Sequence, residues 1–174
     1  MKKIIYDSSI LNGYETRPIT KANCKQVIDV YNSNQDFFIL TEGKPATLSG
    51  CIANIDAMPP GFNPENKFCI GIWENETCIA VLDFLVGYPN LEHLYIGLLL
   101  VHSNLHGKGI GKKIIEYVLA TAKHEGLKTA RVAVCTANSK ALSFWSKLGF
   151  VKTGESRATV GDIIMDVFVM EYSI

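Results

Sequence analysis

The stretch LLVHSNLHGKGIGKK, residues 99–113, runs from an apolar segment into a segment rich in glycine and lysine. Gly107, Gly109 and Gly111 stand at alternate positions, so backbone N–H groups can approach a ligand without interference from Cβ atoms. The N-terminus of a following helix would add partial positive charge. The stretch predicts a phosphate-binding turn between a strand and a helix, although a tight turn without a ligand would use glycines in the same way.

Two common phosphate-binding motifs do not fit this stretch. A P-loop would need glycine at His106 and serine or threonine at Lys113. A dinucleotide-binding fingerprint would need its third glycine at Lys112, and it belongs to a doubly wound sheet. The turn therefore has to be interpreted from its own chemistry.

The segments around the turn alternate between helical and strand-like hydrophobic spacing. This order predicts an α/β (α+β) fold, with a central, mixed, mostly antiparallel twisted sheet of about six to seven strands flanked by about four helices. A parallel step is expected only where the helix over 108–125 crosses over. The expected helices are 20–31, 45–58, 108–125 and 138–148, and the expected strands are 67–73, 77–86, 94–101, 129–135, 150–156 and 162–172.

Length and composition indicate a single domain over residues 1–174, with 17 basic and 17 acidic residues and no net charge. Without a basic field, binding to nucleic acid or to an anionic membrane is not expected. The N-terminal sequence MKKIIYDSSI lacks a signal-peptide pattern and no apolar run is long enough to cross a bilayer, so a cytoplasmic location is expected. Five cysteines without a Cys-x-x-Cys pair and four histidines without a metal-binding spacing predict reduced, mostly core thiols and no metal site.

A second motif follows the expected strand 129–135. Residues 138–150, NSKALSFWSKLGF, spell Asn-x-x-Ala-x-x-Phe-aromatic-x-x-x-Gly-Phe. Together with residues 106–111, which match Arg/Gln-x-x-Gly-x-Gly/Ala except at the first position, this motif resembles the GNAT superfamily of N-acetyltransferases. The two signatures lie within 99–150, and the expected order of elements matches the superfamily over the whole chain.

The resemblance implies a GNAT-like fold that binds acetyl-CoA as co-substrate. Strand backbone would bond to the pantetheine arm, N–H groups of the glycine-rich turn would hold the pyrophosphate, and Asn138 would bond to the pantetheine or cap its helix. Gly97, inside an apolar strand, suggests a bulge or a close backbone approach. The implied cofactor-binding residues are Leu99, Leu100, Val101, His106, Gly107, Lys108, Gly109, Ile110, Gly111, Lys112, Asn138, Ser143 and Trp145.

Three residues depart from the family pattern. His106 stands where arginine or glutamine is usual, and Ser103 stands where proline is frequent. Trp145 stands where many members have a tyrosine proposed to protonate the departing thiolate. Because an indole has no usable acid pKa, either another group is the acid or the thiolate leaves without one.

A base is expected, because an ammonium must lose a proton before it can attack a thioester. Tyr95 falls where some family members carry a glutamate base, and His93 shares its strand face and has a suitable pKa. Asp83 lies inside the apolar run VLDFLV, so it needs a partner or a cavity. Each of the three residues also has an ordinary, non-catalytic interpretation. His93 could lie on the surface, Tyr95 could pack against its neighbours, and Asp83 could be a hydrogen-bonded structural residue.

The function implied by the resemblance is direct transfer of acetyl from acetyl-CoA to a primary amine. The acceptor groove would lie over residues 33–66 and 156–162, and a small-molecule amine is expected there, with a protein amine left open. The alternative is a non-catalytic CoA- or acyl-CoA-binding module of the same fold. A monomer and a homodimer are both compatible with the sequence.

Overall fold

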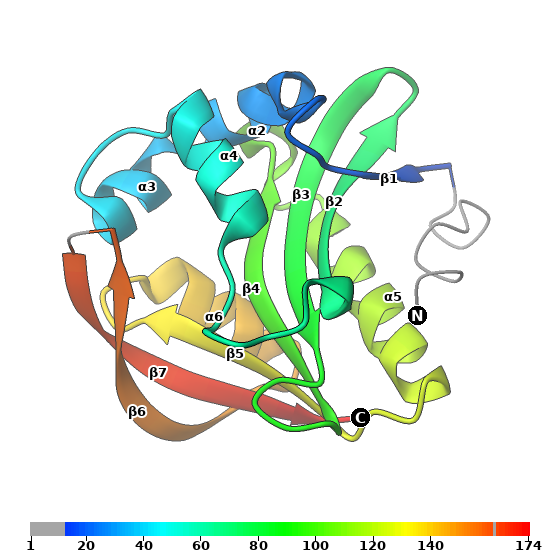
Figure 1. Cartoon of the computed structure of the whole chain (residues 1–174), viewed down its shortest axis with the longest axis vertical. Helices are drawn as coiled ribbons and strands as arrows, with labels where there is room; N and C mark the ends of the chain where they lie inside the picture. Colours follow the sequence, from blue (N-terminus) through cyan, green and yellow to red (C-terminus); the bar gives the residue numbers. More distant parts are fainter. Residues whose placement is uncertain (1–12, 162) are drawn as a thin grey trace.

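The computed structural model describes residues 13–161 and 163–174, which form one seven-stranded sheet covered by helices (Figure 1). The strands are β1 (Glu15–Pro18), β2 (Lys67–Glu74), β3 (Thr77–Val86), β4 (His93–Val101), β5 (Thr129–Cys135), β6 (Val151–Val160) and β7 (Ile163–Ser173). The helices are η1 (Cys24–Val27), α2 (Ile28–Asn32), α3 (Gln35–Glu42), α4 (Leu48–Asp56), η2 (Pro64–Asn66), η3 (Ser103–Leu105), α5 (Ile110–His124) and α6 (Ser139–Lys147). The expected mixed α/β architecture is confirmed.

The sheet order is β1-β2-β3-β4-β5-β7-β6, and β4–β5 is its parallel pair. As expected, the helix of the 108–125 region, α5, makes the crossover between these two strands. The β4–β5 pairing covers only His93–Ile96 against Thr129–Val132. Beyond that point the C-terminal half of β4 has no paired neighbour on the β5 side.

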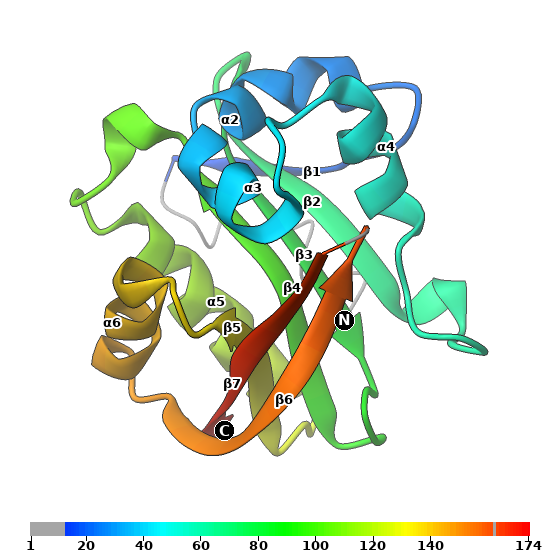
Figure 2. The ribbon, with the colours of Figure 1, turned by 90° about the vertical axis from the view of Figure 1, so that its left-hand side faces the viewer.

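Helices cover both faces of the sheet (Figures 1 and 2). Leu94 and Ile96 of β4 face α5 and join the core cluster that holds Ile114 and Val118. Leu100 faces the other way and packs with the buried residues of α2, α3 and α4. The side chains of β4 thus connect two hydrophobic cores, one on each face.

A β-bulge interrupts β4 at Gly97. Asp83 of β3 pairs with Leu98 and Phe84 pairs with Ile96, so Gly97 is the extra residue. A Cβ atom on Gly97 would stand 2.8 Å from Oδ1 of Asp83. The expectation of a bulge or a close approach at Gly97 is confirmed on both counts.

Several elements differ from the expectation. The helix expected over 20–31 is the 3-10 helix η1 followed by the short helix α2, and β6 extends to Val160 rather than to 156. The strand β1, which is short and polar, was not expected. Helix α3 was not expected either, because four consecutive apolar residues, Phe37–Leu40, hide its helical period. Helix α4 begins at Leu48 rather than near Pro45, since Thr47 caps it by accepting a hydrogen bond from the N–H of Gly50 at 3.0 Å.

Within the described ranges, no helix is long and apolar enough to cross a membrane. The N-terminal sequence MKKIIYDSSI lies outside those ranges.

Replacement Gly97→Ala should lower the free energy of unfolding by about 1–2 kcal/mol, because the new methyl group meets a carboxylate that is fixed in place. The matched control is Gly154→Ala, which lies beside the bulge of β6 and whose Cβ would meet no atom within 4 Å. Urea unfolding of both variants measures the difference, and equal stabilities would contradict the close contact at Gly97.

Candidate active site

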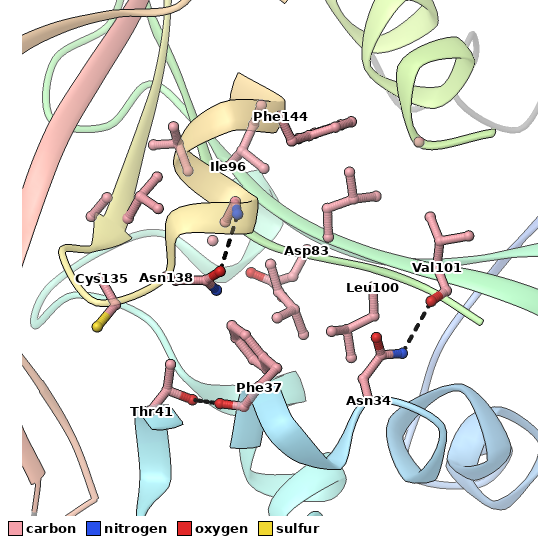
Figure 3. A pocket seen from close by; sticks show the side chains of 18 of the residues that line it. Asn34, Phe37, Thr41, Asp83, Ile96, Leu100, Val101, Cys135, Asn138 and Phe144 are labelled. Carbon is pink, nitrogen blue, oxygen red and sulfur yellow. Dashed lines mark hydrogen bonds between the residues drawn. The ribbon is translucent and has the colours of Figure 1, made fainter. Parts of the chain in front are cut away.

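A continuous cleft of about 1580 Å³ follows the separation of β4 from β5. It extends from the glycine-rich turn before α5, past the start of α6, to the space between β3, α3 and the tips of β6 and β7 (Figure 3). His93, Lys108 and Ser143 are absent from its lining. The cleft brings together the following candidates from the sequence: Asp83, Tyr95, Leu99, Leu100, Val101, His106, Gly107, Gly109, Ile110, Gly111, Lys112, Asn138 and Trp145.

The open edge of β4 presents unpaired backbone to the cleft. The N–H of His102 donates to the carbonyl of Ile79 on β3 at 2.8 Å, so the backbone groups of Leu99 and Val101 point to the opposite side, where β5 has separated. The carbonyl of Val101 accepts hydrogen bonds there from Nδ2 of Asn34 at 3.0 Å and from Nε2 of His106 at 2.8 Å. An amide-bearing chain could add to the edge at Leu99 like a short strand.

The glycine-rich turn forms a concave arrangement of N–H groups. Gly107 and Gly109 have φ angles of 75° and 78°, and a Cβ on either would meet no atom within 4 Å. Gly109 is the N-cap of α5 and the N–H of Lys113 is bonded to its carbonyl, so the N–H groups of residues 110–112 precede the first helical hydrogen bond. These groups fit a pyrophosphate, which needs close donors and positive charge.

Gly111 meets a different requirement from that of the other two glycines. A Cβ there would stand 3.3 Å from the ring of Phe144 on α6 and 3.6 Å from Val101. The third glycine therefore allows α6 to pack against the start of α5. Lysines 112, 140 and 147 of these two helices also line the cleft and add positive charge on this side of the sheet.

Asn138 caps α6, and its Oδ1 accepts a hydrogen bond from the N–H of Ala141 at 3.0 Å (Figure 3). The capping bond uses only the oxygen, so Nδ2 is the atom with which this side chain can bond to a ligand. Trp145 is 6% exposed, and its ring lies 4.9 Å from Phe150 and 5.1 Å from Phe144. It forms part of the core as well as of the cleft wall.

Asp83 forms a buried ion pair that the sequence alone did not identify. Its Oδ2 atom lies 2.5 Å from Nζ of Lys67, and the side chains of Asp83 and Lys67 are 12% and 6% exposed. Burial raises the pKa of Asp83, and the ammonium of Lys67, which acts in the opposite direction, offsets this only in part. Both residues line the cleft, so this carboxylate has a partner and also faces a cavity.

Tyr95 lies on the same face of the sheet, with its ring 5.4 Å from Tyr88 at 87°. Burial raises the pKa of its phenol, Tyr88 adds to this effect and Arg131 opposes it. His93 lies apart from the cleft, with Nδ1 2.6 Å from Oδ1 of Asn90 in the preceding turn. Its predicted catalytic role has no support from this position.

The cysteines are free thiols, as expected, but they differ in location. Cysteines 24, 51, 69 and 78 are buried, whereas Cys135 is partly exposed at the end of β5 and lines the cleft. Burial raises the pKa of Cys69 to about 12, so its thiol is protonated at neutral pH. Among the residues that the structure describes, no group of three or more His, Cys, Asp or Glu could hold a metal ion.

Comparisons with known proteins agree with this geometry. Residues 27–150 match the model of the acetyltransferase (GNAT) family, and the chain belongs to this family. It is similar to an acetyltransferase from Thermus thermophilus, with 19% identity, a TM-score of 0.72 and coverage of 92% of this chain and 97% of that one. It is also similar to an N-acetyltransferase from Thermoplasma acidophilum solved in complex with coenzyme A, with 17% identity, a TM-score of 0.62 and coverage of 92% and 99%.

Two curated relatives match over shorter stretches. A 5-NmdU N-acetyltransferase of Pseudomonas phage PaMx11 is 42% identical over 68 residues, which are 39% of this chain and 44% of that protein. The peptidyl-lysine N-acetyltransferase YjaB of Salmonella typhimurium is 29% identical over 104 residues, 60% of this chain and 63% of that protein. The chain thus spans less than two thirds of the length of either relative.

Replacement Gly109→Glu should abolish the binding of acetyl-CoA, because it places bulk and negative charge among the N–H groups of the turn. In the wild-type protein, a ligand at one hundred times its dissociation constant adds about 2.7 kcal/mol of stability, which thermal unfolding detects. The matched control is Gly126→Glu, since Gly126 also has a positive φ and open surroundings but lies at the far end of α5. Unchanged affinity of the Gly109→Glu variant in calorimetry would contradict the phosphate-binding assignment.

Replacement Lys67→Met should lower the free energy of unfolding by about 3 kcal/mol at pH 7, because it leaves Asp83 buried without its counter-charge. The variant loses both interactions that lower the pKa of Asp83, so this pKa rises further. A raised pKa in the folded state means that folding favours the protonated acid. The loss of unfolding free energy relative to the wild-type protein should therefore be smallest below the ordinary pKa of a carboxyl group. It should grow as pH rises through the raised pKa of Asp83 in the folded variant.

Urea unfolding of Lys67→Met and of the wild-type protein at several pH values tests this dependence. The double variant Lys67→Met, Asp83→Asn carries no carboxyl at this position, so the pH-dependent part of the deficit should vanish. A deficit that is constant with pH in the single variant would contradict the coupling of the two charges.

Proposed function

We propose that this protein transfers the acetyl group of acetyl-CoA directly to a primary amine, and that the amine belongs to a small molecule. The proposal rests on which groups line the continuous cleft. The phosphate-binding turn and a buried carboxylate, Asp83, line the same space, and the open edge of β4 lies between them. A cofactor at the turn and an amine at the carboxylate would meet at this edge.

The chain's own groups fit each part of acetyl-CoA. The N–H groups of the turn over residues 106–112 would hold the pyrophosphate. The backbone of Leu99, the N–H of Val101 and Nδ2 of Asn138 would bond to the pantetheine amides. Acetyl-CoA, when bound, supplies the acetyl group as a thioester. Leu100, which lines the cleft beside these residues, would contact the arm through its side chain.

Asp83 would act as the base. The ammonium of the acceptor gives one proton to this carboxylate, and the freed nitrogen forms a bond to the thioester carbonyl carbon. The C–S bond breaks with its electron pair on sulfur, and the second proton that the acylated nitrogen must lose goes to this thiolate, directly or through water, so that CoA leaves as the thiol. A carboxyl group whose pKa is raised by burial holds a proton better at neutral pH than an exposed one does. Tyr95, on the same face, would orient the acceptor or a water molecule.

The burial of Asp83 supports a small acceptor. Asp83 lines the cleft, and the residue as a whole is only 8% exposed. Helix α3, which also lines the cleft, reaches the tip of β7, where a Cβ on Gly43 would stand 3.3 Å from the side chain of Ile163. The two curated relatives act, by their names, on 5-NmdU and on peptidyl-lysine, so the acceptor has to be argued from this cleft.

A second candidate function is a CoA-binding module without catalysis. The observation that favours it is Trp145, a buried indole that has no proton to give to a departing thiolate. Thermal unfolding with acetyl-CoA would show binding for either function. Release of CoA only when an amine is present would show the enzyme, and binding without release for every amine tested would show the module.

Replacement Asp83→Asn should lower kcat by about a hundredfold to ten-thousandfold, since the amide cannot accept the proton. The thermal shift caused by acetyl-CoA should remain, because Asp83 lies outside the phosphate-binding turn. Tyr95→Phe is the matched comparison on the same face, with a smaller loss of kcat if the phenol only orients the acceptor. The measurement is amine-dependent CoA release, and an Asp83→Asn variant with wild-type kcat would remove Asp83 from the chemistry.

A further inference from the structure

The part of the cleft beyond the phosphate-binding turn, which we term the acceptor chamber, is walled by aromatic and apolar side chains. Its walls come from α3, from the segment after α4, and from β3, the β3–β4 turn, β4 and β7. Figure 3 shows Phe37 of α3 pointing into the space beside Asp83. The residues that define the chamber are Phe37, Met58, Leu85, Tyr88, Tyr95 and Val167.

Charged groups in the chamber are few, and the deep ones compensate each other. At the bottom, Asp83 is paired with Lys67, so their net charge is zero. Arg131 of β5 is not in the lining of this cleft; its charge acts on the phenol of Tyr95, and it is paired with Glu171 at 3.4 Å. Further carboxylates, Asp36 and Glu42, line the cleft from α3, where they favour any cationic amine over a neutral one.

This distribution of charge favours an acceptor with one positive charge. An amine that reaches Asp83 places the rest of its body against the apolar walls. A second ammonium on that body would lose its hydration there, which is strongly unfavourable, and it would gain a counter-charge only where it reached Asp36 or Glu42 on α3. Polyamines and other polycations therefore match the apolar walls less well than a monoamine does.

The rings of the chamber are held at fixed angles. Tyr88 meets Tyr95 edge to face at 5.4 Å and 87°, and Phe62, which is not in the lining of the cleft, supports Tyr88 from behind at 6.1 Å and 87°. Preset ring edges and faces interact best with another flat aromatic ring. A saturated ring of the same size would fill the volume but would lack these oriented contacts.

We propose that the acceptor is a primary monoamine carried on a flat, uncharged aromatic body, such as an arylalkylamine or an aminomethyl heterocycle. Tyr88 and Tyr95 contact the aromatic body, and Tyr88 determines specificity for it. The proposal rests on the proposed function, because it assigns the acceptor of that same acetyl transfer.

The test compares four amines with the full chain at saturating acetyl-CoA. The probes are 2-phenylethylamine, 2-cyclohexylethylamine, spermidine and an N-acetylated peptide with one lysine, with CoA release followed by chromatography and the product by mass spectrometry. The first two differ in the flatness of the ring, and kcat/KM should be about tenfold higher for 2-phenylethylamine. Spermidine and the peptide should be about a hundredfold poorer than 2-phenylethylamine.

Variants then test whether the ring of Tyr88 causes the preference for a flat aromatic amine. Tyr88→Ala should raise KM for 2-phenylethylamine about tenfold and reduce the advantage of the flat ring, while the KM for acetyl-CoA is unchanged. Tyr88→Phe keeps the ring and should retain the advantage. The matched control is Phe62→Ala, which removes an aromatic neighbour of Tyr88 from outside the chamber and should change KM less than the Tyr88→Ala replacement does.

The outcomes separate the two proposals. Turnover that is fastest with spermidine or with the lysine peptide, or equal for the two ring amines, would overturn the acceptor class and leave acetyl transfer intact. A thermal shift with acetyl-CoA but no CoA release with any of the four amines would overturn acetyl transfer itself, and the acceptor class with it. A preference for 2-phenylethylamine that depends on the ring of Tyr88 would establish the acceptor class.

Discussion

The pairing between β4 and β5 ends at Ile96 and Val132, and the site depends on this early separation. In a continuous parallel pair, the backbone groups of Leu99 and Val101 would bond to β5 and the sheet would be closed. Because α5 connects the two strands and begins where they separate, the N-terminal N–H groups of the helix face the same gap. One local departure from regular pairing thus brings an open strand edge and the glycine-rich turn, which we propose as the phosphate-binding site, into a single cleft.

The bulge at Gly97 complements the separation by positioning a charge. A Cβ at Gly97 would stand 2.8 Å from Oδ1 of Asp83, so the carboxylate on β3 can take this place because position 97 is a glycine. A buried ion pair such as Asp83–Lys67 contributes little to stability compared with apolar residues of similar size. Its placement at the cleft, rather than deep in either core, is therefore better explained by chemistry than by folding.

Local patterns predicted most of the fold, because the helices and strands of this chain carry clear hydrophobic periods. Strands β3 and β5 have the expected bounds, and the motifs predicted the glycine-rich turn before α5. The helix cap, one of the two roles predicted for Asn138, is confirmed. The sequence could not reveal Lys67 as the partner of Asp83, since the pairing depends on the register that sets Cys69 opposite Asp83. Three of the predicted site residues, His93, Lys108 and Ser143, do not line the cleft, and the sequence alone does not give the direction of a side chain.

His106, which departs from the family motif, joins the glycine-rich turn to the end of β4 by a hydrogen bond. Nε2 of His106 lies 2.8 Å from the carbonyl oxygen of Val101 and donates a hydrogen bond to it. Nδ2 of Asn34, from the segment between α2 and α3, donates to the same oxygen at 3.0 Å. The N–H of Ser103 adds a bond to Oγ of Ser33 at 3.1 Å. The glycine-rich turn and the N-terminal helices beside the cleft therefore meet at one carbonyl, and in the proposed function this shared oxygen would link the position of the cofactor to that of the acceptor.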